Sequence, residues 1–311
     1  MIATVTLSPA LDKTVVIPAF TVGKVNRIRN IRLDAGGKGI NVSKVLKMLG
    51  TDSIATGVLG GNTGTWIERE LERYDIGSDF VHIDSETRTN LKIIDDILHT
   101  NTDINEPGAA VNAEIIEAVY QKIVQNTVSG DIAVFAGKAP EGVPSSVFGD
   151  LIQRLKVRGI HCYLDADAEL LIHGAAALPD MVKPNEEELA RLTGHELHSV
   201  EDIIRAALHL NDSGIRTVVV SLGAHGAIFV RDQKMYHAPG MNVPVSSTVG
   251  AGDSMMAAFC HGDSHGLSFE ETCRLSIAVS AAEVMQSGTQ PPAYDTVFQL
   301  LPQVKLLPVN P

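Results

Sequence analysis

Residues Ser247–Phe259 read STVGAGDSMMAAF, and this stretch decides how the rest of the chain is interpreted. Three small residues, Gly250, Ala251 and Gly252, precede Asp253, and an apolar run rich in Met and Ala follows at once. This pattern predicts a tight turn into a buried helix whose first amides are free to bind an anion. Asp253 then has two interpretations, a helix-capping acid or a catalytic base beside an anion cradle.

Around this stretch, short apolar segments alternate with segments of helical spacing. IATVTL, DIAVFAG and TVVVSLG are strand-like, whereas INVSKVLKMLG has apolar residues at helical intervals and ends in Gly50. The alternation predicts βαβ units and a mostly parallel sheet covered on both faces. Two segments, residues 12–34 and 87–105 approximately, are strand-like without an intervening helix. They predict a small antiparallel sheet built from two insertions, and no linker divides the chain.

Composition limits the class of protein. The chain has 311 residues, of which 44% are hydrophobic and 20% charged, as is typical of a soluble globular protein. No apolar run reaches the roughly 18 residues of a membrane helix, and the N-terminus resembles a strand more than a signal peptide. Three cysteines without a CxxC pair argue against disulfides or structural zinc. We therefore expect a cytoplasmic protein.

Charge disfavours some partners and leaves others open. A net charge of -12 disfavours nucleic acid and anionic membranes. Residues 21–50 nevertheless carry seven basic side chains against one acid, Asp34. The basic residues are Lys24, Arg27, Arg29, Arg32, Lys38, Lys44 and Lys47. This basic segment is either a solvated surface or a site for a small anion.

Three further turns follow predicted strands, where open α/β sheets bind their ligands. AGGKGINVSKVL, residues 35–46, is a glycine-rich turn into a helix, without Walker A or Rossmann spacing. VKPNEEEL, residues 182–189, is either a helix capped by Asn185 with acids in its first turn, or a site where Asn185 and Glu188 hold hydrated magnesium. VVVSLGAHGAIF, residues 218–229, predicts a hairpin whose glycines would let backbone approach a nucleotide phosphate.

Together these stretches resemble the PfkB-type, or ribokinase-like, carbohydrate kinases along the whole chain. AGGKGIN is similar to the first signature of that family and STVGAGDSM to the second, more specific one. LSPALD, TRTN, NEPG and KPN fall where relatives carry similar pieces. The resemblance implies a single ribokinase-like kinase domain over residues 1–311. It implies a three-layer α/β/α fold with a mostly parallel central sheet, and the two insertions would form a β-sheet lid.

Within this family the chain most resembles the branch that phosphorylates sugar phosphates. The resemblance implies transfer of a phosphoryl group from ATP, with Mg²⁺, to a ketohexose phosphate to give a bisphosphate. Fructose 1-phosphate is the first expectation, with tagatose 6-phosphate and fructose 6-phosphate as alternatives. Arg88 and Lys38 argue against a free sugar as acceptor. A non-catalytic sugar-phosphate sensor on the same scaffold is disfavoured, because Asp253 and its glycines are present.

The resemblance also implies roles for individual residues. Asp253 would be the base, and the amides of Gly250, Ala251 and Gly252 would hold the transferred group. The sugar phosphate would meet Asp12, Arg27, Gly37, Lys38, Asn41 and Arg88. The nucleotide would lie along Lys183, Asn185, Ser221, Gly223, Gly226 and Thr248, with Asn185 and Glu188 at the magnesium ion. The lid would pair two subunits into a homodimer.

Two segments depart from the family pattern. FAGKAPEG carries Lys138 where a small polar residue is usual, and LDADAEL carries Asp167 and Ala168 where Ser-Gly is common. Lys138 and Asp167 would either pair with each other or reshape specificity. A helix N-terminus is also expected to lower the pKa of Asp253, which a loose phosphoryl-transfer transition state tolerates.

Overall fold

The computed structural model describes residues 1–286 and 288–309. Its large sheet has the strand order β15-β14-β13-β12-β11-β10-β9-β1-β4-β5, and β6 pairs with β4. Pairing is parallel from β5 to β12 and antiparallel from β12 to β15. The strands of this sheet are β1 (Ile2–Thr6), β4 (Ile54–Gly60), β5 (Gly77–Ser78), β6 (Val81–Ile83), β9 (Ile132–Gly137), β10 (His161–Ala166), β11 (Met181–Val182), β12 (Thr217–Ser221), β13 (Ala227–Arg231), β14 (Lys234–Ala238) and β15 (Leu307–Pro308).

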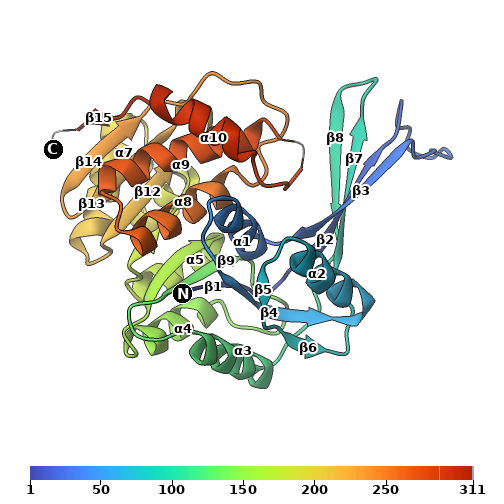
Figure 1. Cartoon of the computed structure of the whole chain (residues 1–311), viewed down its shortest axis with the longest axis horizontal. Helices are drawn as coiled ribbons and strands as arrows, with labels where there is room; N and C mark the ends of the chain where they lie inside the picture. The colour runs from blue at the N-terminus through green and yellow to red at the C-terminus, as the bar shows by residue number, and fades with distance from the viewer. Residues whose placement is uncertain (287, 310–311) are drawn as a thin grey trace.

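Helices cover both faces of this sheet (Figure 1). One face packs against α1 (Lys38–Met48), α2 (Gly61–Arg73), α8 (Ala251–His265), α9 (Phe269–Val284) and α10 (Tyr294–Leu300). The other packs against α3 (Ala113–Asn126), α4 (Val147–Lys156), α5 (Ala168–Ala176), α6 (Glu186–Thr193) and α7 (Val200–Asp212). Two 3₁₀ turns span Gly223–His225 and Leu301–Gln303. The expected three-layer α/β/α fold is therefore confirmed.

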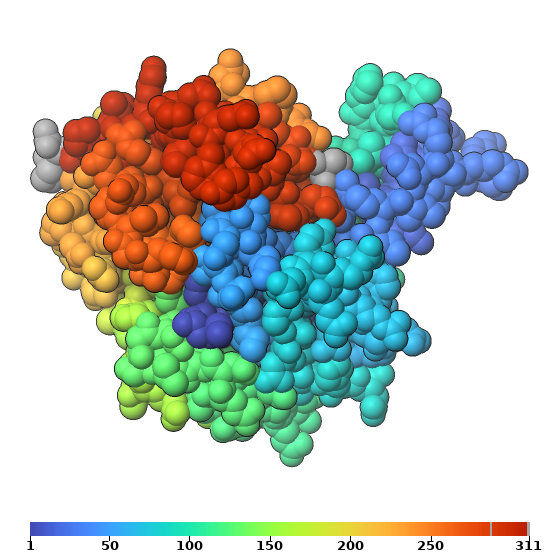
Figure 2. Space-filling model, in the orientation of Figure 1, coloured from blue at the N-terminus to red at the C-terminus, as the bar shows by residue number. Residues whose placement is uncertain are grey.

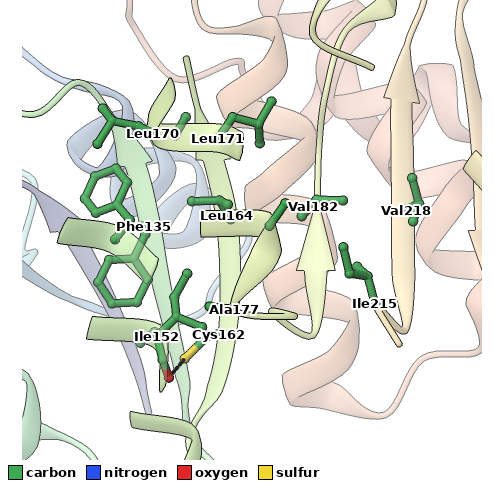
Figure 3. Packing of buried hydrophobic residues seen from close by; sticks show 14 of the residues in the cluster. Phe135, Ile152, Cys162, Leu164, Leu170, Leu171, Ala177, Val182, Ile215 and Val218 are labelled. Atoms are coloured by element: carbon green, nitrogen blue, oxygen red, sulfur yellow. Dashed lines mark hydrogen bonds between the residues drawn. The ribbon is translucent and has the colours of Figure 1, made fainter. Parts of the chain in front are cut away.

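Alternating strand residues build two separate cores. In β9, Phe135 packs toward α4, whereas its neighbour Val134 belongs to the core under α1 and α8, because successive side chains of a strand point to opposite faces. Figure 3 shows Phe135 beside Leu164, Leu170 and other apolar side chains of the first core. Strands buried on both faces fix the sheet, so that the loops at its carboxyl edge are held in place.

The second sheet has four strands in the order β3-β2-β7-β8. It comprises β2 (Ala10–Val16), β3 (Asn30–Gly36), β7 (Thr89–Asp95) and β8 (Thr100–Asn105). The prediction of an antiparallel sheet is wrong in one respect: β2 and β3 form one antiparallel hairpin, β7 and β8 another, but β2 pairs with β7 in parallel. The two hairpins project together from the body of the molecule, and a notch separates their outer part from the C-terminal third (Figures 1 and 2).

No helix in the described part of the chain combines the length and the apolar character that crossing a membrane requires.

Candidate active site

The turn before α8 places Asp253 beside α1. Gly250 has a φ of 88°, and a Cβ added to it would lie 2.6 Å from Oε1 of the buried Glu283. Only glycine suits such a position. The helix then begins at Ala251, and the buried Asp253 accepts a hydrogen bond at Oδ2 from Nδ2 of Asn41, 2.8 Å away. Two predicted site residues from opposite ends of the sequence are thus in direct contact.

The expectation of a lowered pKa for Asp253 is wrong. Burial, and next the negative charge of Asp165, raise its pKa to about 7, against opposing contributions from Lys38 and Asn41. The helix N-terminus favours the ionised form, but removal from water disfavours it more. A carboxyl group that titrates near neutral pH is well suited to accept a proton from a hydroxyl.

Two lysines converge on Asp165 next to Asp253. Lys38, the first residue of α1, lies 3.0 Å from Oδ1 of Asp165 and 2.9 Å from Oδ1 of Asp167. Lys183, which follows β11, lies 3.0 Å from Oδ2 of Asp165. A Cβ on Gly252 would lie 2.9 Å from Nζ of Lys183, so glycine leaves room for the ammonium group at the start of α8. Asp165 was not among the predicted site residues, although its position at the carboxyl end of β10 is typical of ligand-binding residues in open α/β sheets.

A second group of polar residues lies where β2 and β7 meet the body. Nδ2 of Asn90 donates to Oδ1 of Asp12 at 2.9 Å, and Arg88 donates to Oδ1 of Asn90 at 3.1 Å and to the carbonyl of Ser8 at 3.2 Å. Nε of Arg88 is buried without a hydrogen-bond partner among the described residues. An unpaired buried donor is costly, so this arrangement suits an anionic ligand. Asn90 was quoted in TRTN without a role.

Gly36 and Gly37 bring the glycine-rich turn close to Asp12 and to β1. A Cβ on Gly36 would lie 2.1 Å from Oδ2 of Asp12, and one on Gly37, with a φ of 126°, would lie 2.7 Å from Thr6. Burial is the largest influence on Asp12 and raises its pKa, although Asn90 opposes this. The structure therefore gathers Asp12, Gly37, Asn41 and Arg88 around one turn, whereas Lys38 contacts the Asp165 group.

A cavity of about 340 Å³ lies between the β12–β13 turn and the start of α8. Its lining includes the predicted nucleotide residues Ser221, Gly223, Gly226 and Thr248, together with Ala251 and Gly252. Gly223 and Gly226 flank the 3₁₀ turn of a β-hairpin, as the sequence predicts. Met255 lines the cavity and also belongs to the core under α8.

Asn185 and Glu188 form a capping box at the start of α6. Oδ1 of Asn185 accepts from the Glu188 amide at 2.9 Å, and Oε2 of Glu188 accepts from the Asn185 amide at 2.8 Å. Asn185 bridges to Ser221 on the cavity wall. Burial has the largest influence on Glu188 and raises its pKa, and the negative charge of Asp165 raises it further, against the hydrogen bond from the Asn185 amide. Among residues 1–286 and 288–309 no three His, Cys, Asp or Glu side chains cluster as for a metal site.

Two basic residues noted in the sequence, Arg27 and Lys138, lie apart from the side-chain contacts of the site. Arg27 is exposed in the turn between β2 and β3, which points away from the body, and the structure does not bring it to the other site residues. Lys138 follows β9, is exposed and forms no ion pair within the described residues. The suggested pairing of Lys138 with Asp167 is wrong, because Asp167 binds Lys38.

Comparison with known proteins places this geometry in a family. Residues 6–296 match the pfkB family carbohydrate kinases. The chain is 36% identical to 1-phosphofructokinase of Rhodobacter capsulatus over 99% of its own length and 98% of that protein, and 35% identical to 1-phosphofructokinase of Escherichia coli K12 over 99% of both. A crystal structure of Escherichia coli phosphofructokinase-2 with substrates and products superposes with a TM-score of 0.93 at 30% identity, covering 97% of this chain and 98% of that one. The chain belongs to the pfkB family of carbohydrate kinases.

Proposed function

We propose that this kinase transfers the γ-phosphoryl group of ATP to fructose 1-phosphate and yields fructose 1,6-bisphosphate. The observation that carries the proposal is the similarity to proteins named 1-phosphofructokinase over nearly their whole length. The geometry is compatible with it: Arg88, with its unpaired Nε, suits the phosphate already on the sugar, and Asp253 suits the hydroxyl that is to be phosphorylated.

The catalytic roles follow from the contacts around α8. Asp253 accepts the proton of the attacking sugar hydroxyl. The hydroxyl oxygen bonds to the γ-phosphorus as the bond from that phosphorus to ADP breaks and ADP leaves. Asn41 orients the carboxylate through its 2.8 Å hydrogen bond. The free amides from Gly250 to Gly252 hold the charge of the transferred group, as helix N-termini do for anions. Asp12 and Gly37 would contact sugar hydroxyls. Arg27 would reach a bound sugar phosphate only if the lid of one subunit covered the site of the other.

The nucleotide is assigned to the 340 Å³ cavity, with Ser221, Gly223, Gly226 and Thr248 along it. Lys183 lies against Gly252, which lines that cavity and precedes Asp253, and Asn185 adjoins Ser221. Magnesium fits these donors, because it uses few protein oxygens and keeps water and phosphate ligands; Asn185 and Glu188 would hold it. When bound, it would neutralise charge on the phosphate oxygens.

A second acceptor, fructose 6-phosphate, is favoured by the superposition on Escherichia coli phosphofructokinase-2, one structure of which contains fructose-6-phosphate and has a TM-score of 0.91 at 29% identity. Tagatose 6-phosphate is the third candidate. All three carry one phosphate and, in the furanose form, one free primary hydroxyl, so each matches a site with Arg88 at the phosphate and Asp253 at the hydroxyl.

The proposal is tested by ADP release from the purified full chain with ATP and Mg²⁺ across these three sugar phosphates. We expect the highest kcat/KM with fructose 1-phosphate. A higher kcat/KM with either other sugar phosphate would overturn the choice of acceptor, and no turnover with any of the three would overturn the proposed reaction class.

We further propose a homodimer formed through the lid and a cytoplasmic location. Apolar side chains on the outer strands of the lid are exposed, among them Ile31, Leu33 and Ile104. Exposed apolar groups gathered on a small sheet suit an interface with a second copy. The three cysteines are buried and free, which suits a reducing compartment.

A further inference from the structure

Lys38 is held between two carboxylates that differ in their surroundings. Its Nζ lies 3.0 Å from Asp165 and 2.9 Å from Asp167. The side chain of Asp165 is 3% exposed, whereas that of Asp167 is 36% exposed. Burial lowers the pKa of Lys38, but the charges of Asp165 and Asp167 outweigh burial and raise it above its usual value. Lys38 therefore stays protonated at neutral pH.

Only one of the two carboxylates is free to move. The second oxygen of Asp165 binds Lys183, so Asp165 is fixed by two cations in a buried setting. Asp167 has Lys38 as its only side-chain partner among the described residues, and its carboxylate makes no capping bond at the start of α5. If the Asp167 carboxylate separates from Lys38, water can solvate it, because it is partly exposed. The buried carboxylate of Asp165 would lose its partner without gaining water.

The charges of this cluster cancel before any ligand arrives. Lys38 and Lys183 contribute two positive charges, and Asp165 and Asp167 contribute two negative charges. Asp253 interacts electrostatically with both Lys38 and Asp165, and it adds further negative charge when ionised. A phosphate group that approaches Lys38 therefore meets no excess positive charge unless a carboxylate leaves.

Backbone geometry indicates that Asp167 is held in place at some cost. The next residue, Ala168, begins α5 with a φ of 48°. A residue with a Cβ is disfavoured in this region, because the Cβ crowds the following carbonyl oxygen. The turn nevertheless directs Asp167 to Lys38, on the edge of the sheet where the other site residues lie.

We propose that Asp167 is a displaceable counter-ion that determines specificity. It pairs with Lys38 in the ligand-free enzyme, and a phosphate oxygen of the sugar phosphate replaces it there when the substrate binds. The proposal rests on the proposed function, because it assigns an anionic substrate to this site. Asp165 keeps Lys38 in position during the exchange. A small anion such as inorganic phosphate binds weakly, because it must displace Asp167 without the remaining contacts that a complete substrate makes.

The test compares Asp167→Asn with Asp167→Glu and with Glu169→Gln. Glu169 also lies at the start of α5 and is 70% exposed, so its neutralisation gives the same change in net charge away from Lys38. A ³¹P NMR titration with inorganic phosphate measures anion affinity and needs no turnover. Steady-state kinetics with the best sugar phosphate and ATP measure the effect on the reaction.

We expect Asp167→Asn to bind inorganic phosphate about threefold more tightly, to be inhibited by it more strongly, and to have a KM for the sugar phosphate about threefold lower at similar kcat. Asp167→Glu should return these values toward wild type, and Glu169→Gln should leave them unchanged. Unchanged phosphate affinity in Asp167→Asn would overturn the proposal. A raised KM would also overturn it and indicate that Asp167 binds a sugar hydroxyl. If wild type turns over no sugar phosphate, the proposed function fails, and the phosphate titration still decides the role of Asp167.

Discussion

Asp253 is the residue on which opposing electrostatic effects meet. Its helix N-terminus favours a carboxylate, while burial and Asp165 favour the acid and bring the pKa to about 7. A base must be ionised to accept a proton, so kcat/KM should fall tenfold for each pH unit below about 7 and level off above it. A pH–rate profile from 5.5 to 9 with the best sugar phosphate tests this.

Because a sugar phosphate has its own ionisation near pH 6, the profile needs a control. Asp253→Glu moves the carboxyl group within the site without altering the substrate, so an inflection that belongs to the base should shift in this variant. A wild-type profile that is flat down to pH 5.5 would contradict the assignment.

Arg88 is assigned to the phosphate that the sugar carries. Replacing it by Gln removes the charge and the buried unpaired Nε, so we expect the KM for the sugar phosphate to rise about tenfold or more. The KM for ATP should change little. Arg73→Gln is the matched control, since Arg73 is exposed and pairs with Glu70 on its own helix. Equal effects of Arg88→Gln on both KM values would argue against this role.

The sequence was a good guide to some of these residues and a poor guide to others. Asp253 and Asn41 lie in the first turns of helices that follow recognisable glycine-rich turns, and the structure brings their side chains within 2.8 Å. Asp165 lies at a strand end, which indicates its general position but not its partners. The side-chain contacts of Asp165 and Asn90 join segments far apart in the chain, and no local pattern predicts such pairings. The sign of the Asp253 pKa shift was missed for a similar reason, since burial depends on the whole fold.

At the scale of elements, the turn into α8 depends on Gly250. Gly250→Ala would impose a positive φ on alanine and press its Cβ against the buried Glu283. Gly130→Ala is a matched control, because Gly130 has a φ of 91° but a Cβ there would meet nothing within 4 Å. We expect Gly250→Ala to lose about 1–3 kcal/mol more unfolding free energy than Gly130→Ala, as measured by denaturant titration. Equal losses would show that the contact with Glu283 carries no strain.

The elements themselves were largely predictable, and their pairing was less so. Continuous apolar strands alternating with helices predicted the parallel sheet correctly. The small sheet was expected to be antiparallel, yet β2 and β7 pair in parallel. Each hairpin is a local feature of its own sequence, but which strands of two hairpins meet is decided by how both leave the body.

In the whole molecule, we propose that two copies pair through the four-stranded sheet β3-β2-β7-β8, the proposed lid. Ile31 and Leu33 lie two residues apart on β3, so their side chains share one face of the sheet. Replacing both with Glu should leave the fold intact and convert a dimer to a monomer in light scattering after gel filtration. Val157→Glu, at an exposed position of the body, is the control. A monomeric wild type, or a double variant that still dimerises, would contradict an interface on this face.

Asp253 is the proposed base of the kinase reaction, and Asp253→Asn isolates this role. Asn keeps the size of the side chain and its place beside Asn41 but cannot accept the hydroxyl proton. Steady-state ADP release should show kcat lowered by about 10³-fold or more, while calorimetry should find the affinity for the sugar phosphate within about threefold of wild type. A kcat close to that of wild type would show that Asp253 is not the base.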